Sequence, residues 1–426
     1  MSKWKLYTPE GFQDILTEDC FKKRNIESRI RKLFNQYGYL EIETPILEFY
    51  DTFSIEPDLS PQENMFKFFD KQGRILVLRP DITIPIARIA ATKLKGVKNP
   101  IRLSYIANTF RYNEVGGGRQ NEFTQAGVEL LGTNTPEADA EVIVMAINVL
   151  KQSGLEKFQI DIGQVEFFKG LMLETGLSKD DVEQMRVLID KKDFIGIKKL
   201  VNCYDINDRL KDLIFNLPTL YGSIDKVIEG VKNAGINKNC ERALENLKIV
   251  LEIIEEYGLS QYVSVDLGMV QSLNYYTGII FKGFTHGIGF PILSGGRYNN
   301  LISKFGRDYP ATGFSVGINM IMSSVQRQKI KLIGKRPPKI ICYEKGFRKT
   351  AIDFCMELRE KGEVVEMDTS MKPYGEITEY AKKNGASFVV KIVDENSLLM
   401  YDIKNNKEEK MSKNKFKNIA LSRGED

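Results

Sequence analysis

The sequence predicts an α+β protein with two folding units, and three observations support that class. Residues 101–131 read as two strand-forming runs joined by a polar, glycine-rich loop, which is typical of a hairpin. Residues 166–258 are rich in Lys and Glu and carry an apolar stripe at helical spacing. After a linker, strand-like and helix-like segments alternate, which favours a small α/β domain. We therefore expect a core at 1–330 with its helical insertion at about 166–258, a linker at 331–338, and a second domain at 339–426.

The composition is that of a globular protein and excludes several functional classes. Of 426 residues, 42% are hydrophobic and 28% are charged, and the net charge is only +4. No apolar run has the length of a membrane span, and the N-terminus lacks the apolar core of a signal peptide, so we expect a cytoplasmic protein with no membrane partner. The weak positive charge argues against gripping a long run of tRNA phosphates.

Metal and disulfide chemistry are not indicated. The five cysteines form no CxxC pair, and there is a single histidine, His286. One histidine cannot build a His-based metal cluster, and we expect His286 to be a structural or bystander residue. We expect no metal and no cofactor.

The N-terminal segment predicts a helix, an edge strand and a hairpin. Apolar residues recur at helical spacing from about Glu18 to Tyr37, and Gly38 ends the helix. A strand follows at Leu40–Leu47; because it contains Pro45, which cannot donate a ladder hydrogen bond, it should lie at an edge or a bulge. Met65–Asp81 reads as a hairpin around a Lys-Gln-Gly turn.

The rest of the chain supplies the remaining sheet and helices. We expect a helix at Pro136–Gln152 and further strands at Phe158–Gly163 and Val263–Leu267. The lysine-rich tail after residue 403 reads as a solvated surface, although a nucleic-acid contact is the alternative.

The second strand of the 101–131 pair has an unusual polar face. Alternate residues of a strand share a face, so Gln125, Gly127 and Glu129 point away from their apolar neighbours. The two polar side chains stand about 13 Å apart at roughly 3.3 Å per residue, and the glycine leaves room between them. Arg111, which ends the neighbouring strand, can reach the same space. A ligand site or an ordinary solvent-facing strand would both give this pattern.

Ser104–Gly132 resembles motif 2 of the class II aminoacyl-tRNA synthetases, in its histidyl-tRNA synthetase version: Phe-Arg-Tyr, a glycine-rich loop with Arg, then Glu-Phe, Gln, Gly, Glu and Gly. The helix and proline-bearing strand at 18–47 resemble motif 1, which forms the dimer interface in that group. Thr312–Met322 occupies the position of motif 3, a strand leading into a helix, and Gly295–Tyr298 resembles a further block, a turn into a helix. The resemblance implies an antiparallel class II sheet flanked by helices, with a C-terminal domain like the anticodon-binding domain.

The same resemblance implies a histidine-binding set. In the histidyl-tRNA synthetase family, an acidic residue and a threonine at Asp81 and Thr83 bind the amino group, and the paired tyrosines contact the substrate ring. Without the resemblance, Asp81 would be read as a helix cap. The residues implied are Asp81, Thr83, Arg111, Gln125, Glu129, Tyr275 and Tyr276.

The chain departs from the family where ATP would bind. Gln271 replaces an arginine, Asn274 an aspartate, and Asn319 and Met320 the acidic residue and arginine of motif 3. Two of three phosphate-facing cations are therefore missing, and only Arg111 remains. Losing one such charge typically costs about 10²–10³ in rate, so we expect no useful adenylation and no catalytic residues.

This selective loss, together with the RPDIT, YYTG, GGRY and FGRDYPATGFSVG segments, resembles the ATP phosphoribosyltransferase regulatory subunits. That resemblance implies a non-catalytic partner of a short catalytic subunit in a hetero-octamer, self-dimerisation through the motif 1-like segment, and histidine feedback inhibition. Histidine could bind this chain, the partner or their interface. An active histidyl-tRNA synthetase and a non-catalytic tRNA-binding module are the alternatives.

Overall fold

The computed structural model describes residues 3–57, 61–112, 120–232, 235–270, 275–332 and 334–422. The chain forms two compact units, residues 1–333 and 334–426. None of the helices in the described ranges is long and apolar enough to cross a membrane.

The first unit is built on a nine-stranded sheet in the order β1-β5-β6-β12-β11-β10-β7-β9-β8. Pairing is antiparallel except for β1 with β5 and β7 with β9. This mixed, mainly antiparallel sheet confirms the predicted fold class. The strands are β1 (Leu40–Glu41), β5 (Ile101–Phe110), β6 (Glu122–Leu131), β7 (Phe158–Gln164), β8 (Tyr221–Gly222), β9 (Val263–Asp266), β10 (Ile279–Thr285), β11 (Leu293–Arg297) and β12 (Ala311–Gly317).

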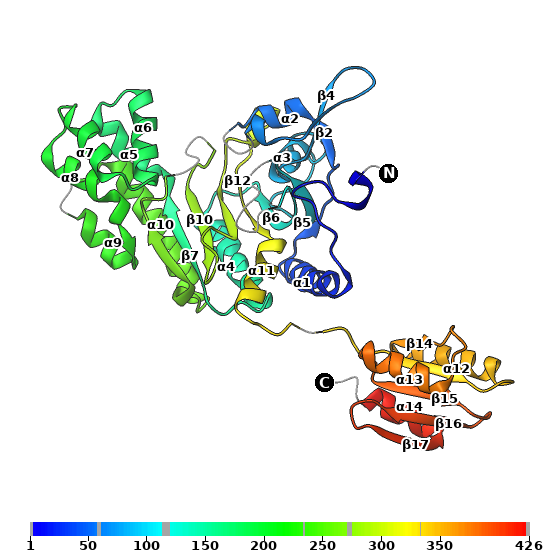
Figure 1. Cartoon of the computed structure of the whole chain (residues 1–426). Helices are drawn as coiled ribbons and strands as arrows, with labels where there is room; N and C mark the ends of the chain where they lie inside the picture. Colours follow the sequence, from blue (N-terminus) through cyan, green and yellow to red (C-terminus); the bar gives the residue numbers. More distant parts are fainter. Residues whose placement is uncertain are drawn as a thin grey trace. The chain divides into compact units, whose positions relative to one another are not determined.

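Helices α1 (Thr17–Gln36), α4 (Pro136–Gln152) and α11 (Ile318–Arg327) lie on one side of this sheet (Figure 1). Their apolar side chains form one core with Ala126, Val128 and Leu130 of β6. Successive side chains of β6 point to opposite faces of the sheet, so its apolar side chains enter the core, as predicted, and Gln125 and Glu129 lie on the opposite face.

The opposite face is partly covered by a smaller layer. It contains α2 (Tyr50–Ser54), α3 (Thr83–Thr92) and a three-stranded sheet, β2-β4-β3, made of β2 (Leu47–Phe49), β3 (Lys67–Phe69) and β4 (Ile75–Leu78). Apolar residues of α3 pack with Leu103 and Tyr105 of β5 and with Tyr275 and Tyr298. The predicted hairpin at 65–81 is present as β3 and β4.

Two local predictions about this unit are wrong in detail. The single strand expected at Leu40–Leu47 is split into β1 and β2, and Pro45 lies in the gap between them. β1 does end the nine-stranded sheet, so the edge position inferred from Pro45 is correct. The Gly295–Tyr298 segment, expected as a turn into a helix, is largely strand, because Gly295 and Gly296 pair with β10 and β12.

Six α-helices lie between β7 and β9 in the described residues, where the sequence predicts a helical insertion. Only the two-residue β8 departs from that pattern. Leu247 and Ile254 of the predicted stripe are buried, and Leu244 and Leu251 pack against the same core. The helices are α5 (Val165–Thr175), α6 (Lys179–Asp190), α7 (Phe194–Asn202), α8 (Asp208–Asn216), α9 (Ile224–Val231) and α10 (Lys238–Glu256).

The second unit is a five-stranded sheet in the order β14-β13-β15-β16-β17 with helices on both faces. The lysine-rich tail forms β17 and α14. Its Lys404, Lys407, Lys410 and Lys415 are exposed, as the solvated-surface interpretation expects, whereas Met411 and Phe416 are buried in the core. The elements are β13 (Lys339–Tyr343), α12 (Arg348–Glu360), β14 (Val365–Met367), α13 (Tyr374–Lys383), β15 (Phe388–Ile392), β16 (Ser397–Asp402), β17 (Lys407–Ser412) and α14 (Lys413–Ser422).

Candidate amino-acid-binding site

A cavity of about 300 Å³ opens on the polar face of the large sheet, and all seven residues predicted for histidine binding line it. They come from elements far apart in the sequence: the start of α3 and the segment before it, the residue after β5, strand β6, and the segment before β10. The cavity's floor is made of small residues on β11 and β12. The predicted lining residues are Asp81, Thr83, Arg111, Gln125, Glu129, Tyr275 and Tyr276.

Glu129 is the most deeply enclosed carboxyl group of the cavity. Thr83 Oγ1 donates a hydrogen bond to its Oε1 at 2.8 Å, and the Tyr298 hydroxyl donates to its Oε2. Burial raises the pKa of Glu129 to about 8, against the lowering effect of these two hydrogen bonds. Gly313 is required beside it, because a Cβ at that position would lie 1.9 Å from Glu129 Oε2. The carboxyl group is thus fixed in place and can exchange a proton near neutral pH.

Asp81 serves two purposes at once. Its Oδ1 accepts a hydrogen bond from the backbone N–H of Ile84 at 3.1 Å, in the first turn of α3, so the helix-capping interpretation is correct. The same carboxylate also lines the cavity. Burial raises its pKa, and the positive charge of Arg111 opposes that effect. Asp81 can therefore hold an ammonium group without leaving the helix.

Arg111 brings a positive charge to the cavity from the end of β5. Its Nε donates to the Pro80 carbonyl at 3.0 Å, and its guanidinium lies over the Phe123 ring, 5.4 Å from the centroid. These two contacts hold the planar group in a fixed orientation, which suits recognition of an anion.

Three tyrosines form an aromatic wall. The Tyr275 ring packs edge-on against Tyr276, with centroids 4.6 Å apart, and stacks on Tyr298 at 5.4 Å. Burial raises the pKa values of Tyr275 and Tyr298 well above the usual range, so both remain neutral hydroxyl donors. A flat ligand ring would find apolar faces and hydroxyl groups here.

Gln125 carries a buried amide oxygen that has no hydrogen-bond partner among the residues that the structure describes. An unsatisfied buried acceptor costs about 1–3 kcal/mol, so a ligand donor would relieve it. The space expected above Gly127 is not available: the Tyr105 ring fills it, and a Cβ at Gly127 would lie 2.5 Å from the Tyr105 hydroxyl oxygen.

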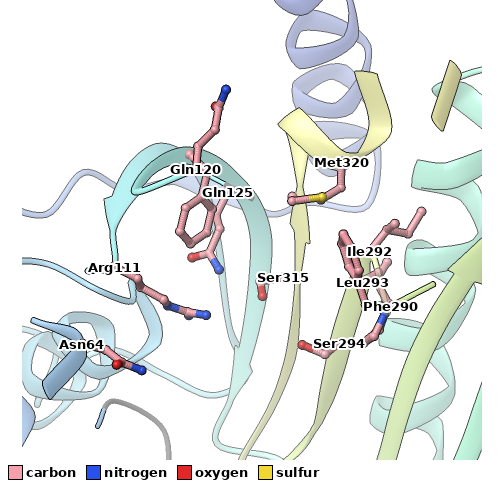
Figure 2. Close-up of a pocket in the computed structure, with 13 residues that line it drawn as sticks. Asn64, Arg111, Gln120, Gln125, Phe290, Ile292, Leu293, Ser294, Ser315 and Met320 are labelled. Atoms are coloured by element: carbon pink, nitrogen blue, oxygen red, sulfur yellow. The ribbon is translucent and has the colours of Figure 1, made fainter. Parts of the chain in front are cut away.

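A second cavity of about 330 Å³ adjoins the first and shares with it Arg111, Gln125, Pro291, Ser294 and Ser315. Figure 2 shows Met320 reaching it from the yellow helix α11, whereas Arg111 extends from another wall. Its other lining residues include Phe290, Ile292 and Leu293.

Asn319, the neighbour of Met320, does not serve the cavities. Its Oδ1 accepts from the Thr124 N–H at 3.0 Å, and its Nδ2 donates to Gln120 Oε1 at 2.8 Å. It therefore ties α11 to the start of β6. The other departures from the synthetase pattern, Gln271 and Asn274, lie outside the described residues, as does the glycine-rich loop at 116–118.

The remaining candidates lie apart from the cavity. His286 is exposed, beyond the end of β10. Across the described residues, no group of three or more His, Cys, Asp or Glu side chains could hold a metal ion.

Sequence reasoning missed several lining residues of the cavity, among them Tyr298 and Lys282. Tyr298 follows Gly295-Gly296-Arg297 directly, but its role depends on Glu129, which is distant in the sequence. Lys282 interrupts an otherwise apolar strand, Ile279–Phe284, and that interruption was the available signal.

The fold is that of a class II synthetase-like domain of the histidyl type. The family model described as histidyl-tRNA synthetase matches residues 11–321. A histidyl-tRNA synthetase from Nostoc sp. PCC 7120 has the same fold, with a TM-score of 0.84 at 20% identity over 98% of this chain and 99% of that one.

More similar proteins carry a different description. A protein of Acetivibrio thermocellus, named ATP phosphoribosyltransferase regulatory subunit, is 58% identical over 95% of this chain and 96% of its own length. One of Ruminiclostridium cellulolyticum with the same name is 53% identical over 97% and 98%. A crystal structure from Bacillus halodurans, described as an ATP phosphoribosyltransferase regulatory subunit/histidyl-tRNA synthetase, has a TM-score of 0.81 at 32% identity, covering 91% of this chain and 98% of that one. The chain belongs to the ATP phosphoribosyltransferase regulatory subunit family.

Proposed function

We propose that this chain is a non-catalytic subunit that binds free histidine in the cavity and regulates a separate catalytic ATP phosphoribosyltransferase chain. Family membership supports the partnership. The cavity supports histidine as the ligand, because acidic groups, an aromatic wall and a cation line the same space. The volume of this space is at the lower end of the range for ligand pockets. We place this assembly, a hetero-octamer with the short catalytic subunit, in the cytoplasm.

Each part of a histidine molecule has a matching group. The ammonium group faces Asp81, with the unsatisfied Gln125 oxygen as a second acceptor. The imidazole ring packs on the tyrosine wall, and Glu129 exchanges a hydrogen bond with a ring nitrogen. The carboxylate faces Arg111. Glu129 with its fixed geometry is the observation that carries this proposal, because an imidazole needs a partner that can donate or accept a proton.

The adjoining cavity argues against amino-acid activation. Adenylation places an anionic carboxylate against the α-phosphate of ATP and needs cations to stabilise the transition state. At the motif 3 positions the chain offers Met320, which is apolar, and Asn319, whose amide is already hydrogen-bonded within the protein. We infer that ATP is not activated here.

Feedback inhibition follows if histidine binds two conformations of the assembly with different affinities. A ligand shifts a conformational equilibrium only by the difference between its affinities for the two states. The cavity joins α3, the β10 side of the sheet and the tyrosine wall, so closing it around a ligand would move these elements together.

Titration calorimetry of the full chain with L-histidine tests the ligand. We expect saturable binding that Glu129→Gln weakens at least tenfold, whereas Glu183→Gln, a matched change on the exposed face of α6, leaves it unchanged. No heat with millimolar histidine would remove the cavity from the mechanism.

Reconstitution with a short catalytic chain tests the regulatory role. Phosphoribosyltransferase activity should appear only in the mixture, and histidine should inhibit it less when Glu129→Gln is present. The chain alone should support no histidine-dependent ATP–pyrophosphate exchange. Exchange at a synthetase-like rate would instead establish the alternative, an active histidyl-tRNA synthetase.

A further inference from the structure

A third cavity, of about 360 Å³, lies between the helical insertion and the large sheet, and it shares no lining residue with the two cavities described above. It is lined from α4, α5 and α10 and from the segment that follows the tyrosine pair. Among its lining residues in the described ranges, Leu173 and Ala243 carry the only apolar side chains. Its volume is within the range of small-molecule sites, and its polarity suits a polar ligand.

Lys169 of α5 brings a positive charge to this cavity, and two contacts hold it in place. Its Nζ donates to the Tyr276 carbonyl at 3.3 Å and to Glu166 Oε1 at 3.0 Å. An ammonium group has three N–H donors, so these contacts with described residues leave the third donor for a ligand.

Arg242 of α10 brings a second positive charge. Its Nε donates to the Lys238 carbonyl at 3.3 Å, and its Nη2 donates to Asn239 Oδ1 at 2.6 Å. Both acceptors are neutral, so neither compensates the charge, yet together they fix the plane of the guanidinium group. Because arginine can only donate, the Asn239 oxygen is used within the protein, and its Nδ2 is the amide atom that can serve a ligand.

A close approach of α5 to α10 brings the two cations to one space. A Cβ at Gly170 would lie 2.8 Å from Cys240 Sγ and 3.3 Å from Asn239 Cβ, so only glycine allows this packing. Asn237 Nδ2 also donates to the Gly170 carbonyl at 2.7 Å, which ties the two helices together at this point. Lys169, the neighbour of Gly170, therefore lies on the same side as the first turn of α10.

Hydrogen bonds also orient the Asn246 amide. The backbone N–H of Glu166 donates to Gln164 Oε1 at 3.0 Å, so Nε2 of the same side chain is left to donate. It donates to Asn246 Oδ1 at 2.9 Å. The oxygen of Asn246 is thus used within the protein, and its Nδ2 remains as a donor for a ligand.

The Asn134 amide, at the start of α4, is oriented in the same way. Asn299 Oδ1 accepts from the Ala311 N–H at 3.1 Å and from Arg297 Nη1 at 3.3 Å, so Asn299 must donate through its Nδ2. That donor reaches Asn134 Oδ1 at 3.2 Å. Three amide NH₂ groups and two cations therefore line one cavity, which makes its lining rich in donors.

The acidic groups of the cavity are engaged by its basic groups. Arg297 Nη2 lies 2.9 Å from Asp139 Oδ1 at the buried floor, and Glu166 is paired with Lys169. Arg242 is the third basic residue of the lining, against two acidic ones, so the charge of the cavity favours an anion. A phosphate group offers three oxygens to this many donors, whereas a carboxylate offers two.

We propose that this cavity binds a small sugar phosphate, whose phosphate group is held by Lys169 and Arg242. The amide groups of Asn239 and Asn246 complete the donors around the phosphate, and Glu166 accepts a hydrogen bond from a sugar hydroxyl group. The site is separate from the histidine cavity, and its occupation does not require histidine.

Titration calorimetry of the full chain with ribose 5-phosphate tests the site. We expect saturable binding, competition by inorganic phosphate, and no binding of ribose, which lacks the phosphate group. Arg242→Gln removes a charge-assisted hydrogen bond, so ribose 5-phosphate should bind roughly 10- to 100-fold more weakly. Lys169→Met should weaken it by a similar factor.

Two control variants make the same change of charge elsewhere. Arg209→Gln alters an exposed arginine on α8, outside the cavity, and Arg111→Gln alters the cation of the histidine cavity. Neither should change the affinity for ribose 5-phosphate by more than about twofold. Thermal unfolding of each variant establishes that it is folded.

The outcomes separate this site from histidine sensing. No saturable binding of ribose 5-phosphate at millimolar concentration would overturn the site, and so would equal weakening by Arg242→Gln and Arg209→Gln, or weakening by Arg111→Gln alone. Histidine should bind the Arg242→Gln chain as it binds the unchanged chain. Failure of the unchanged chain to bind histidine would overturn the proposed function and leave the sugar phosphate site standing.

Discussion

Glu129 shows how a single buried residue can carry both a stability cost and a function. Its two oxygens accept hydrogen bonds from Thr83 and Tyr298, and Gly313 leaves the space it occupies. Burial nevertheless disfavours its ionised form, and its pKa is raised from 4.5 to about 8. A group with that pKa can be either donor or acceptor toward an imidazole near neutral pH.

The raised pKa predicts a pH-dependent stability. A carboxyl group whose pKa is higher in the folded protein binds protons more tightly there, so it stabilises the fold at low pH and loses that contribution as pH rises from about 4.5 to 8. Glu129→Gln removes this titration. Between pH 5 and pH 8.5, the free energy of unfolding of the unchanged chain should therefore fall relative to the variant, on the order of 2–4 kcal/mol.

Urea unfolding of both proteins across that pH range measures the effect. The variant also loses one of the two accepted hydrogen bonds, but that loss does not depend on pH. Two stability curves that run parallel from pH 5 to pH 8.5 would show that Glu129 does not titrate in this window.

At the scale of elements, helix α3 is anchored by the same carboxylate that faces the ligand. Asp81 accepts the N–H of Ile84, and Thr83, in the first turn of α3, donates to Glu129. The position of α3 over the sheet therefore places both an ammonium acceptor and a hydroxyl donor. The cap and the ligand contact use one side chain, but they can be separated by mutation.

Asp81→Asn keeps an acceptor oxygen and removes the charge, whereas Asp81→Ala removes both. We expect the alanine variant to lose about 1 kcal/mol of stability through the lost cap, and the asparagine variant to lose little. Both should bind histidine at least tenfold more weakly, because neither offers a charge to the ammonium group. Denaturant unfolding and calorimetry of the pair check this, and a stable asparagine variant with full affinity would assign Asp81 to the helix alone.

At the scale of the whole molecule, the first unit exposes apolar side chains near the edge of its large sheet. Leu40 of β1 is 71% exposed, Ile46 51%, Leu47 49% and Phe49 43%. Clustered exposed apolar residues often mark an interface, and an edge strand offers unpaired backbone groups. These observations support the self-dimer that the motif 1-like segment predicts.

We expect the chain to be a dimer in solution and Ile46→Glu to shift it toward monomer, because a buried unpaired carboxylate opposes association. Ile352→Glu is the matched control: Ile352 is 39% exposed on α12 of the second unit. Light scattering of the eluted peaks gives the mass directly. A dimer that survives Ile46→Glu would place the interface on another surface.

The sequence determined those features that depend on local periodicity and composition. Alternation along Gln125–Leu130 separated a core row from a polar row, and helical spacing with a proline start and a glycine stop located α4 at residues 136–152. The resemblance in Asp81, Thr83 and the tyrosine pair then predicted seven residues that the structure brings to one cavity.

Only the tertiary structure decided which side chains meet across the sheet. Tyr105 fills the space above Gly127, Tyr298 holds Glu129, and the register aligns Lys282 with two serines along the cavity floor. The lysine-rich tail likewise folds because Met411 and Phe416 find a core supplied by earlier strands. Periodicity is a property of one strand or helix, whereas these contacts join residues far apart in the chain, so they exist only once the strand order and register are set.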